Sequence, residues 1–415
     1  MCLIELMLKK DNLILGWIII YFLATVLFFA PVMLVTVVKI ISWLIVSITF
    51  LNVFPYIFFK NKRDIKFSTL FKCITLMILL TPVVSSIFHP QSIFHGLRMI
   101  MDVLPFTFFF FLCKYRVSIN KLEKIIWVIT AMYIFIFLLA LALAPAIFFD
   151  ASGGKVEELN TGRGIARVKI LGSCILHLAF FISINKGFVH KQKKYILLCG
   201  FFFLLILLNV SRQHIVFALL VGMLMVFRTV KWYYFALVLG ILGGIFFYLI
   251  KNVDFVQQMI ELTFEQTEDG VNENVRVLSF LYYVFGYNDS IPQIIFGNGI
   301  PHTNSSWGED ILYFSKITGF YLSDVGYAKV FFYWGLIGLS LFLLLIFRAI
   351  FTRTMDDSVI YCRYYLIFVL LTNIASHSFF TEIIAIVFAI YILEESNRQK
   401  TNAKHELLSS VEKSI

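Results

Sequence analysis

The sequence predicts an all-α polytopic membrane protein, with about twelve transmembrane helices and a partly helical extracytoplasmic cap loop. Hydrophobic residues make up 60% of the 415 residues and charged residues only 14%, whereas soluble domains are roughly 45–50% apolar and about 25% charged. The mean hydropathy is +0.88. The 35 basic and 25 acidic residues leave a net positive charge, but the basic residues fall in short clusters between apolar runs. This distribution indicates membrane topology rather than a nucleic-acid partner.

Twelve apolar segments approach the length of about 20 residues that a membrane-spanning helix needs. These predicted spans are residues 13–30, 34–59, 67–88, 96–113, 125–148, 169–185, 195–209, 213–227, 233–250, 328–347, 364–379 and 381–394. The first segment lacks a small-residue cleavage site and runs directly into the second. We therefore expect it to be retained as a membrane anchor.

Lysine and arginine concentrate in every second connector between these spans. The basic connectors are residues 60–66, 114–124, 185–194, 228–231 and 348–363, together with the C-terminal tail. If the N-terminus is cytoplasmic and twelve spans follow, all of them fall on the cytoplasmic side, as the positive-inside rule requires. The charges therefore predict a multi-pass protein with both termini in the cytoplasm.

The same threading places most of the polar sequence in two loops on the outer side, a shorter one at 150–167 and a large one at 251–327. Within the large loop, the helix-like apolar spacing of 254–267, 274–287 and 306–317 predicts three helices, and residues 292–299 are expected to form a turn. The sequence contains no tandem repeat. Residues 1–415 are therefore expected to form a single membrane-embedded domain.

Four arginines lie on the predicted outer side, where the positive-inside rule does not place basic residues. They are Arg163 and Arg167 in the shorter loop, Arg212 in the turn between two spans, and Arg276 in the large loop. A guanidinium binds phosphate oxygens through paired N–H donors and stays charged when partly desolvated, so this set could hold a lipid pyrophosphate. The alternative is that each pairs with a lipid headgroup or a loop carboxylate. Arg212 is the strongest candidate, because a charge so close to hydrocarbon is costly and usually functional.

Several side chains in the stretch before the tenth predicted span could accept a proton from a hydroxyl group. They are His302, Glu309, Asp310 and Asp324. Asp324 lies directly before the span, so capping of the helix N-terminus is an equal alternative. For His302, which follows a Gly-Asn-Gly turn, the alternative is an exposed loop histidine. Glu309 and Asp310 are equally well explained as first-turn acids of a loop helix.

Other charged residues and missing motifs limit the predicted site further. Arg98 and Asp102 are four positions apart on a predicted helix, which favours an ion pair. His377 and Glu382 flank the last outer turn and could join the site. There is no Walker A loop, dinucleotide fingerprint, D-x-D pair or zinc-type Cys/His spacing. We therefore expect no cofactor and no metal, with a divalent cation held by scattered loop carboxylates as the alternative.

With these features, the chain resembles the O-antigen polymerase (Wzy) family and the related O-antigen ligases. The resemblance covers the whole chain in its topology. Locally it is carried by the outer arginines, by the sequence PQIIFGNG at 292–299, and by Asp324 ahead of a span that contains GLIG. Ligases typically carry a His-Asn pair before that span, where this chain has Ser323 and Asp324, which favours the polymerase. His302, followed by Thr-Asn, keeps the ligase as an alternative.

The resemblance implies a membrane glycosyltransferase at the periplasmic face of a bacterial inner membrane. It would polymerise undecaprenyl-pyrophosphate-linked oligosaccharide repeat units into O-antigen or capsular polysaccharide. The implied roles are pyrophosphate binding by the outer arginines and proton removal by an acid or histidine of the periplasmic cap: Arg163, Arg167, Arg212 and Arg276 for binding, Asp324 and then His302 for catalysis.

The expected partners follow from the same resemblance. They are undecaprenyl-pyrophosphate-linked glycans, the lipid bilayer and a polysaccharide chain-length regulator, and no nucleic acid is expected. The alternative of another class is a lipid-linked oligosaccharide flippase. Flippases have short loops on both sides and polar residues along their helices, whereas here most polar residues lie in the outer loops.

Overall fold

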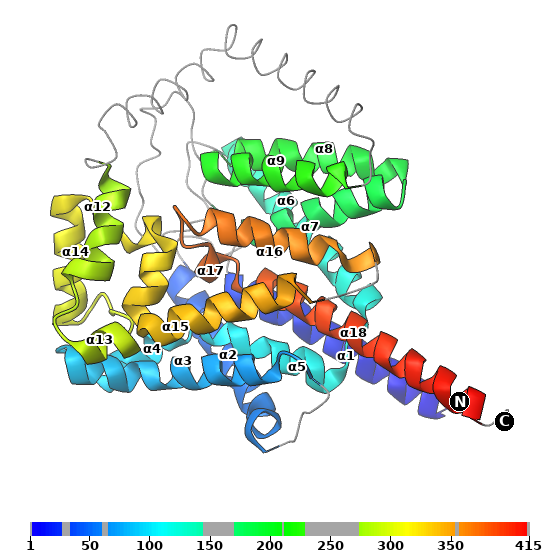
Figure 1. Cartoon of the computed structure of the whole chain (residues 1–415), viewed down its shortest axis with the longest axis horizontal. Helices are drawn as coiled ribbons and strands as arrows, with labels where there is room; N and C mark the ends of the chain where they lie inside the picture. Colours follow the sequence, from blue (N-terminus) through cyan, green and yellow to red (C-terminus); the bar gives the residue numbers. More distant parts are fainter. Residues whose placement is uncertain are drawn as a thin grey trace, which may run out of the picture.

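The computed structural model describes residues 2–26, 34–59, 65–143, 170–209, 211–228, 274–352 and 357–412. Within these ranges every regular element is a helix, which confirms the predicted all-α class. Figure 1 shows the long helices packed side by side, most of them along the longest dimension of the molecule.

The helices of the first part of the chain are α1 (Cys2–Val26), α2 (Val35–Phe58), α3 (Ser68–Phe88), α4 (Ile93–Ile100), a 3-10 turn (Leu104–Thr107), α5 (Phe108–Tyr115), α6 (Ile119–Leu143), α7 (Ser173–Ile184), α8 (Lys193–Leu208) and α9 (Arg212–Phe227). Those of the second part are α12 (Val275–Leu281), α13 (Ile291–Phe296), α14 (Ser306–Thr318), α15 (Gly326–Ile350), α16 (Tyr361–Thr372), α17 (Ser378–Thr381) and α18 (Ile383–Glu412). Every predicted span except 233–250, which lies outside the described residues, overlaps one or two of these helices.

Four helices within the described residues are long and apolar enough to cross a membrane. They are Thr36–Phe58, Ser68–Phe88, Ile119–Leu143 and Gly326–Ile350, and the pair Ile93–Ile100 and Leu104–Tyr115, bent by 53°, is a fifth candidate. Helices α7, α8, α9 and α16 have 12 to 16 residues, fewer than the about 20 of a straight span. The chain is therefore a multi-pass membrane protein with four or five long candidate spans, and the number twelve stays a prediction.

Helix α2 shows how the bundle meets the bilayer. It buries Val46 and Val53 against the core and exposes Ile40 (51%), Leu44 (58%) and Leu51 (67%) on its other face. Large apolar side chains on an open helix face are unfavourable in water but favourable in hydrocarbon. This face of α2 is therefore suited to contact lipid.

Aromatic rings fill the core between these helices. Phe71 of α3 stacks on Phe109 of α5 at 4.0 Å between ring centres, and Tyr21 of α1 stacks on Phe108 at the same distance. Offset and stacked ring pairs add to the free energy of burial, by about 0.5–1.5 kcal/mol each. The short helix α5 is thereby held in the middle of the bundle, between α1 and α3.

Connectors that the sequence predicts to be cytoplasmic meet one another at one end of the bundle. The Lys186 ammonium lies 2.5 Å from Glu123 Oε2, and the Tyr361 hydroxyl donates to Glu123 Oε1 at 2.9 Å. The Lys66 ammonium donates to Thr352 Oγ1 at 3.1 Å. These contacts link four of the predicted basic connectors, 60–66, 114–124, 185–194 and 348–363. Connectors that the charge pattern predicts to lie on the same side of the membrane are therefore in contact.

The large predicted outer loop forms a cap on the turn between α3 and α4. Gln91 in that turn accepts hydrogen bonds from the His302 backbone N–H (2.8 Å) and from Ser305 Oγ (3.0 Å). The His89 ring stacks on Trp307 at 4.0 Å between ring centres. Figure 1 shows α12, α13 and α14 at the end of the molecule that is opposite to both chain termini, as the predicted topology requires.

Inside the cap, two of the predicted helices are confirmed and one predicted turn is wrong in part. The prediction for 306–317 corresponds to α14, and that for 274–287 corresponds to α12 and its π-helical continuation. The segment 292–299 is helical as far as Phe296 and turns only at Gly297. The proline was interpreted as a turn signal, but it occupies the first turn of α13, where its missing N–H costs nothing. The prediction for 254–267 lies outside the described residues.

Candidate functional site

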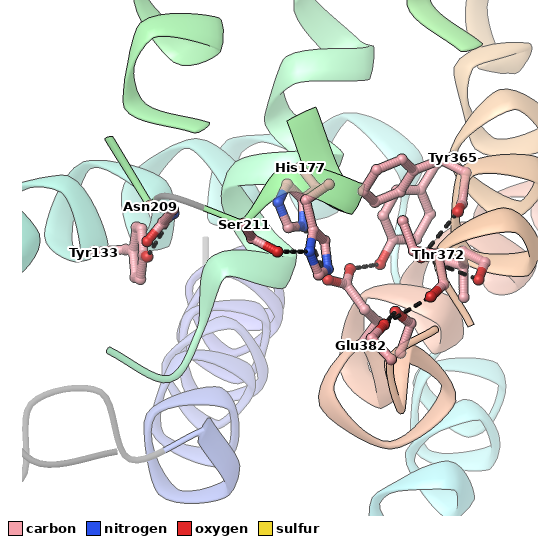
Figure 2. A network of polar contacts seen from close by, with 12 residues as sticks. Tyr133, His177, Asn209, Ser211, Tyr365, Thr372 and Glu382 are labelled. Atoms are coloured by element: carbon pink, nitrogen blue, oxygen red, sulfur yellow. Dashed lines mark hydrogen bonds and ion pairs between the residues drawn. The ribbon is translucent and has the colours of Figure 1, made fainter. Parts of the chain in front are cut away.

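A group of polar side chains lies buried where α7, α16 and the junction of α17 with α18 meet (Figure 2). His177 Nδ1 is 2.9 Å from Glu382 Oε1, and the Tyr365 hydroxyl donates to Glu382 Oε2 at 2.6 Å. The exposed fractions are 1% for His177 and 1% for Glu382. A carboxylate so far from water is tolerated only where its oxygens are satisfied, and both oxygens of Glu382 are.

A second histidine extends this group toward the start of α9. The His214 ring stacks on His177, with 5.0 Å between centres and 11° between planes. His214 Nδ1 is 2.5 Å from Ser211 Oγ. The ring of Phe368 lies 5.0 Å from His177 and 5.9 Å from His214, measured between centres. The two imidazoles therefore share one apolar wall. We refer to His177, His214, Glu382 and Tyr365 as the His–Glu cluster.

The turn that carries Glu382 is held in place by contacts from neighbouring helices. The Phe379 backbone N–H donates to Asn373 Oδ1 at 3.0 Å, and Gln213 Nε2 of α9 donates to the Ala375 carbonyl at 2.6 Å. At Gly326, the first residue of α15, a Cβ would meet the Ser376 carbonyl at 2.0 Å. Only glycine lets α15 approach this closely, so the turn and with it Glu382 are fixed by close backbone packing.

Two histidines and one carboxylate in this cluster could hold a metal ion. One possible ligand atom each from His177, His214 and Glu382 lie within 4.8 Å of one another, and no other such group occurs in the described parts of the chain. The sequence does not predict this group, because its members are 37 and 168 positions apart. The only hint was that His177 and His214 lie in apolar segments, where a titratable group is costly.

The structure places two of the four predicted pyrophosphate-binding arginines. Arg212 is the first residue of α9, in the same helical turn as His214 of the His–Glu cluster, and is partly buried. Arg276 is exposed near the start of α12, in the cap. Arg163 and Arg167 lie outside the described residues.

Asp324 lies in a 3-10 turn (Leu322–Asp324) directly before α15 and is partly exposed. The alternative that it caps α15 is wrong, because the N-cap is Val325 and no side chain makes a capping hydrogen bond there. The backbone of this turn contacts the α16–α17 connection, since His377 Nδ1 is 2.7 Å from the Ser323 carbonyl oxygen. The Ser323 hydroxyl donates to Asp324 Oδ1 at 3.3 Å, so the carboxylate is held by its neighbour and not by the helix.

His302 is a partly exposed loop histidine with an ordered ring. Its ring stacks on His95 at 4.5 Å between centres, and its Nδ1 accepts the Asn304 backbone N–H at 3.1 Å. Partial burial, with His95 and the charges of Arg98 and Lys39 nearby, lowers the pKa of His302 below its ordinary value. The imidazole is therefore neutral near pH 7, and Nε2 is the nitrogen that carries its proton.

The predicted ion pair between Arg98 and Asp102 is not among those in the described part of the chain. Helix α4 ends at Ile100, and the chain then bends by 53°. The two residues consequently do not share a continuous helix face.

Lys329 of α15 is a basic residue that was not predicted to take part in the site. Its ammonium lies 4.7 Å from the Phe380 ring centre.

In the comparisons with known proteins, no family model matches the chain, and neither a curated protein nor a solved structure matches it. The fold and the site define an all-helical, multi-pass membrane protein with a helical cap at one end and a buried His–Glu cluster between its helices.

Proposed function

We propose that this protein is a membrane glycosyltransferase that polymerises undecaprenyl-pyrophosphate-linked oligosaccharide repeat units into O-antigen or capsular polysaccharide. It would act at the periplasmic face of the bacterial inner membrane, with twelve spans and both termini in the cytoplasm. The observation that carries this proposal is the position of Arg212. A guanidinium at the first residue of α9 adds its charge to the positive end of the helix dipole, which favours a phosphate there.

In the proposed reaction, each of the candidate residues has a defined role. The bond between the anomeric carbon and the pyrophosphate of the donor breaks as the acceptor hydroxyl oxygen attacks that carbon. Arg212 and Arg276, with Arg163 and Arg167, would stabilise the charge that develops on the leaving pyrophosphate. Asp324 would take the hydroxyl proton, and His302 is the second candidate for this role.

The proposed partners are the two lipid-linked glycans, the surrounding bilayer and a chain-length regulator. A large polar acceptor requires an outer surface on which to bind, and the cap formed by α12, α13 and α14 provides one. No nucleotide sugar is needed, because the pyrophosphate linkage of the donor already carries the leaving group.

Two other functions each have one observation in their favour. An O-antigen ligase, which transfers the glycan to the lipid A core, is favoured by His302, which is followed by Thr303 and Asn304. A lipid-linked oligosaccharide flippase is favoured by the buried His–Glu cluster, because ionisable groups between membrane helices are typical of transporters. Against the ligase, Ser323 and Asp324 stand where ligases typically carry a His-Asn pair. Against the flippase, most polar residues of the sequence lie in the predicted outer loops.

The test is deletion of the gene in its native host, followed by gel electrophoresis of the surface polysaccharide. Wild type, Arg212→Ala and Arg228→Ala are supplied in turn at matched protein levels. Arg228 lies at the opposite end of α9, where it pairs with Asp357 at 3.4 Å, and is therefore the control. We expect the ladder to collapse to a single repeat unit in the deletion strain and with Arg212→Ala, and to return with Arg228→Ala.

Loss of even the single repeat unit in the deletion strain would indicate the ligase or the flippase instead. A ladder of unchanged length with Arg212→Ala would contradict the assignment of Arg212 to pyrophosphate binding. Arg276, which lies in the cap, is tested in the same way with Arg276→Ala. A shortened ladder with this variant would show that both arginines act on the substrate.

A further inference from the structure

We propose that His177, His214 and Glu382 form a binding site for a divalent transition-metal cation, with Zn²⁺ as the best match to the ligand chemistry. The inference does not depend on the polymerase. It rests on three side chains that come from three separate helical segments and meet inside the bundle.

The ligand set is the first argument. Two imidazole nitrogens and one carboxylate oxygen are the protein ligands of many zinc sites that keep an open coordination position. Magnesium and calcium prefer oxygen ligands, so they suit this group poorly. Thiolate-preferring metals lack a sulfur ligand in the group. Nitrogen-rich sites of this kind select zinc and its neighbours in the first transition row.

The distances are the second argument. The ligand atoms lie within 4.8 Å of one another, whereas zinc bonds of about 2.0–2.1 Å in a tetrahedral site place neighbouring ligands roughly 3.3 Å apart. His177 Nδ1 and Glu382 Oε1 already lie 2.9 Å apart, so the site would close by a movement of about 1.5 Å or less of the third ligand, His214, toward them. Because the two rings are nearly parallel, one of them must also turn so that both lone pairs converge. His214 is the less buried of the two and lies in the first turn of a helix, so this adjustment falls to it.

The surrounding hydrogen bonds are the third argument. Histidine ligands of zinc usually hold their second ring nitrogen against an oxygen, which fixes the ring orientation. His214 Nδ1 has such a partner in Ser211 Oγ at 2.5 Å, a hydroxyl that must follow the ring when it turns toward the metal. The ligand carboxylate is oriented in the same way, because the Tyr365 hydroxyl donates to Glu382 Oε2 at 2.6 Å. Two of the three ligands thus have an oriented outer partner.

The environment favours a cation over a proton at this position. His177 Nδ1 and Glu382 Oε1 lie 2.9 Å apart, so a single shared proton joins them at present. A divalent cation would replace that proton and bind both groups. The affinity for the cation would be lower at acidic pH, where protons compete for the imidazoles. The Phe368 ring covers both imidazoles, which excludes water on that side and strengthens the electrostatic attraction to the carboxylate.

The test uses the purified full-length protein in detergent. The protein is first treated with a chelator to remove bound metal and is then titrated with CoCl2. Co²⁺ takes the place of zinc and gives visible absorption bands whose intensity reports four- or five-fold coordination. We expect the bands to saturate at one equivalent per chain and to disappear when one equivalent of Zn²⁺ is added. Glu382→Gln and His214→Gln should lose the bands. His95→Gln, which changes a histidine stacked on His302 in the outer loop, is the control and should keep them.

A wild-type protein without saturable bands would overturn the proposal, as would equal titrations for the wild type, Glu382→Gln and His214→Gln. If the two variants do not fold, the X-ray absorption spectrum of the zinc-loaded wild type decides. We expect scattering from two imidazoles and from oxygen. A sulfur neighbour would assign the metal to another site and overturn the proposal. These readouts do not depend on polysaccharide synthesis, so the two proposals can fail separately.

Discussion

Glu382 and His177 are 205 positions apart in the sequence, yet their side chains meet at 2.9 Å in a part of the bundle where each is only 1% exposed. Tyr365 of α16 occupies the other oxygen of the same carboxylate. One carboxylate therefore joins α7, α16 and the α17–α18 junction. Its contacts tie these short helices to one another.

Removal of this carboxylate should destabilise the protein strongly. Glu382→Ala would leave the His177 ring and the Tyr365 hydroxyl buried without an acceptor. Breaking a buried pair by removing one partner costs about 3–5 kcal/mol. Tyr365→Phe removes one hydrogen bond to a charged group, which costs about 1.5–3 kcal/mol. Thermal unfolding in detergent measures both. Glu309→Ala, at an exposed position of α14, is the control and should change the midpoint little.

The helices could be predicted from the sequence because each is encoded locally. Apolar runs of nearly the length of a membrane and clusters of Lys and Arg between them are visible without any knowledge of contacts. The cap helix α14 (Ser306–Thr318) ends one residue beyond the predicted 306–317, and Gly319 directly after it has a left-handed conformation (φ 76°). The errors arose where a local signal has two meanings, as with the proline at the start of α13.

The His–Glu cluster could not be predicted, because nothing local links its members. Glu382 was considered only for its place beside the last outer turn, and His177 and His214 were not singled out. The stability of a buried carboxylate depends on which groups surround it in space. For the same reason the spacing of Arg98 and Asp102 was misleading, since the bend after Ile100 cannot be deduced from their separation.

Close packing at the start of α15 leads to a second prediction. A Cβ at Gly326 would lie 2.0 Å from the Ser376 carbonyl and 2.4 Å from Asn373 Oδ1. Gly326→Ala must therefore push α15 away from the turn before α17, and overpacking of this kind typically costs about 1–3 kcal/mol. Gly200→Ala is the matched control, because a Cβ at Gly200 meets nothing within 4 Å. We expect a lower unfolding temperature for Gly326→Ala only. Equal temperatures would show that α15 can shift without cost.

The pH dependence of the reaction should identify the base. His302 has a pKa below its ordinary value of 6.5, so it stays neutral as the pH falls to 6.5, and Nδ1 can accept a proton once the Asn304 backbone N–H releases it. If it is the base, the rate of polymer formation in membrane vesicles should decline only below that pH. Arg98→Gln removes a charge that lowers the pKa of His302, so it should move the decline to higher pH. A decline that Arg98→Gln does not move would assign the base to Asp324.

The same shift has a consequence for stability, with a defined sign. Since the pKa of His302 is lower in the folded protein than the ordinary 6.5, the unfolded chain binds the proton more readily between these two values. Stability contributed by this residue is therefore fully present above pH 6.5 and falls as the pH drops through that window. The effect is small, because the ring is partly exposed. His302→Asn should make the unfolding temperature slightly less dependent on pH below 6.5, as thermal unfolding at a series of pH values would show.

The two ends of the bundle should lie on opposite sides of the membrane. Tyr313 of α14 is 68% exposed in the cap, whereas Lys194 is exposed at the start of α8, near the connectors that Lys186 and Glu123 join. We expect Tyr313→Cys to react with a membrane-impermeant maleimide in intact cells, and Lys194→Cys to react only after permeabilisation. The wild type, with its own cysteines, measures the background. Because charged connectors resist translocation, the reverse pattern would contradict the predicted topology, and with it the proposed periplasmic placement of Arg212. Labelling of both in intact cells would show that the two ends are not separated by the bilayer.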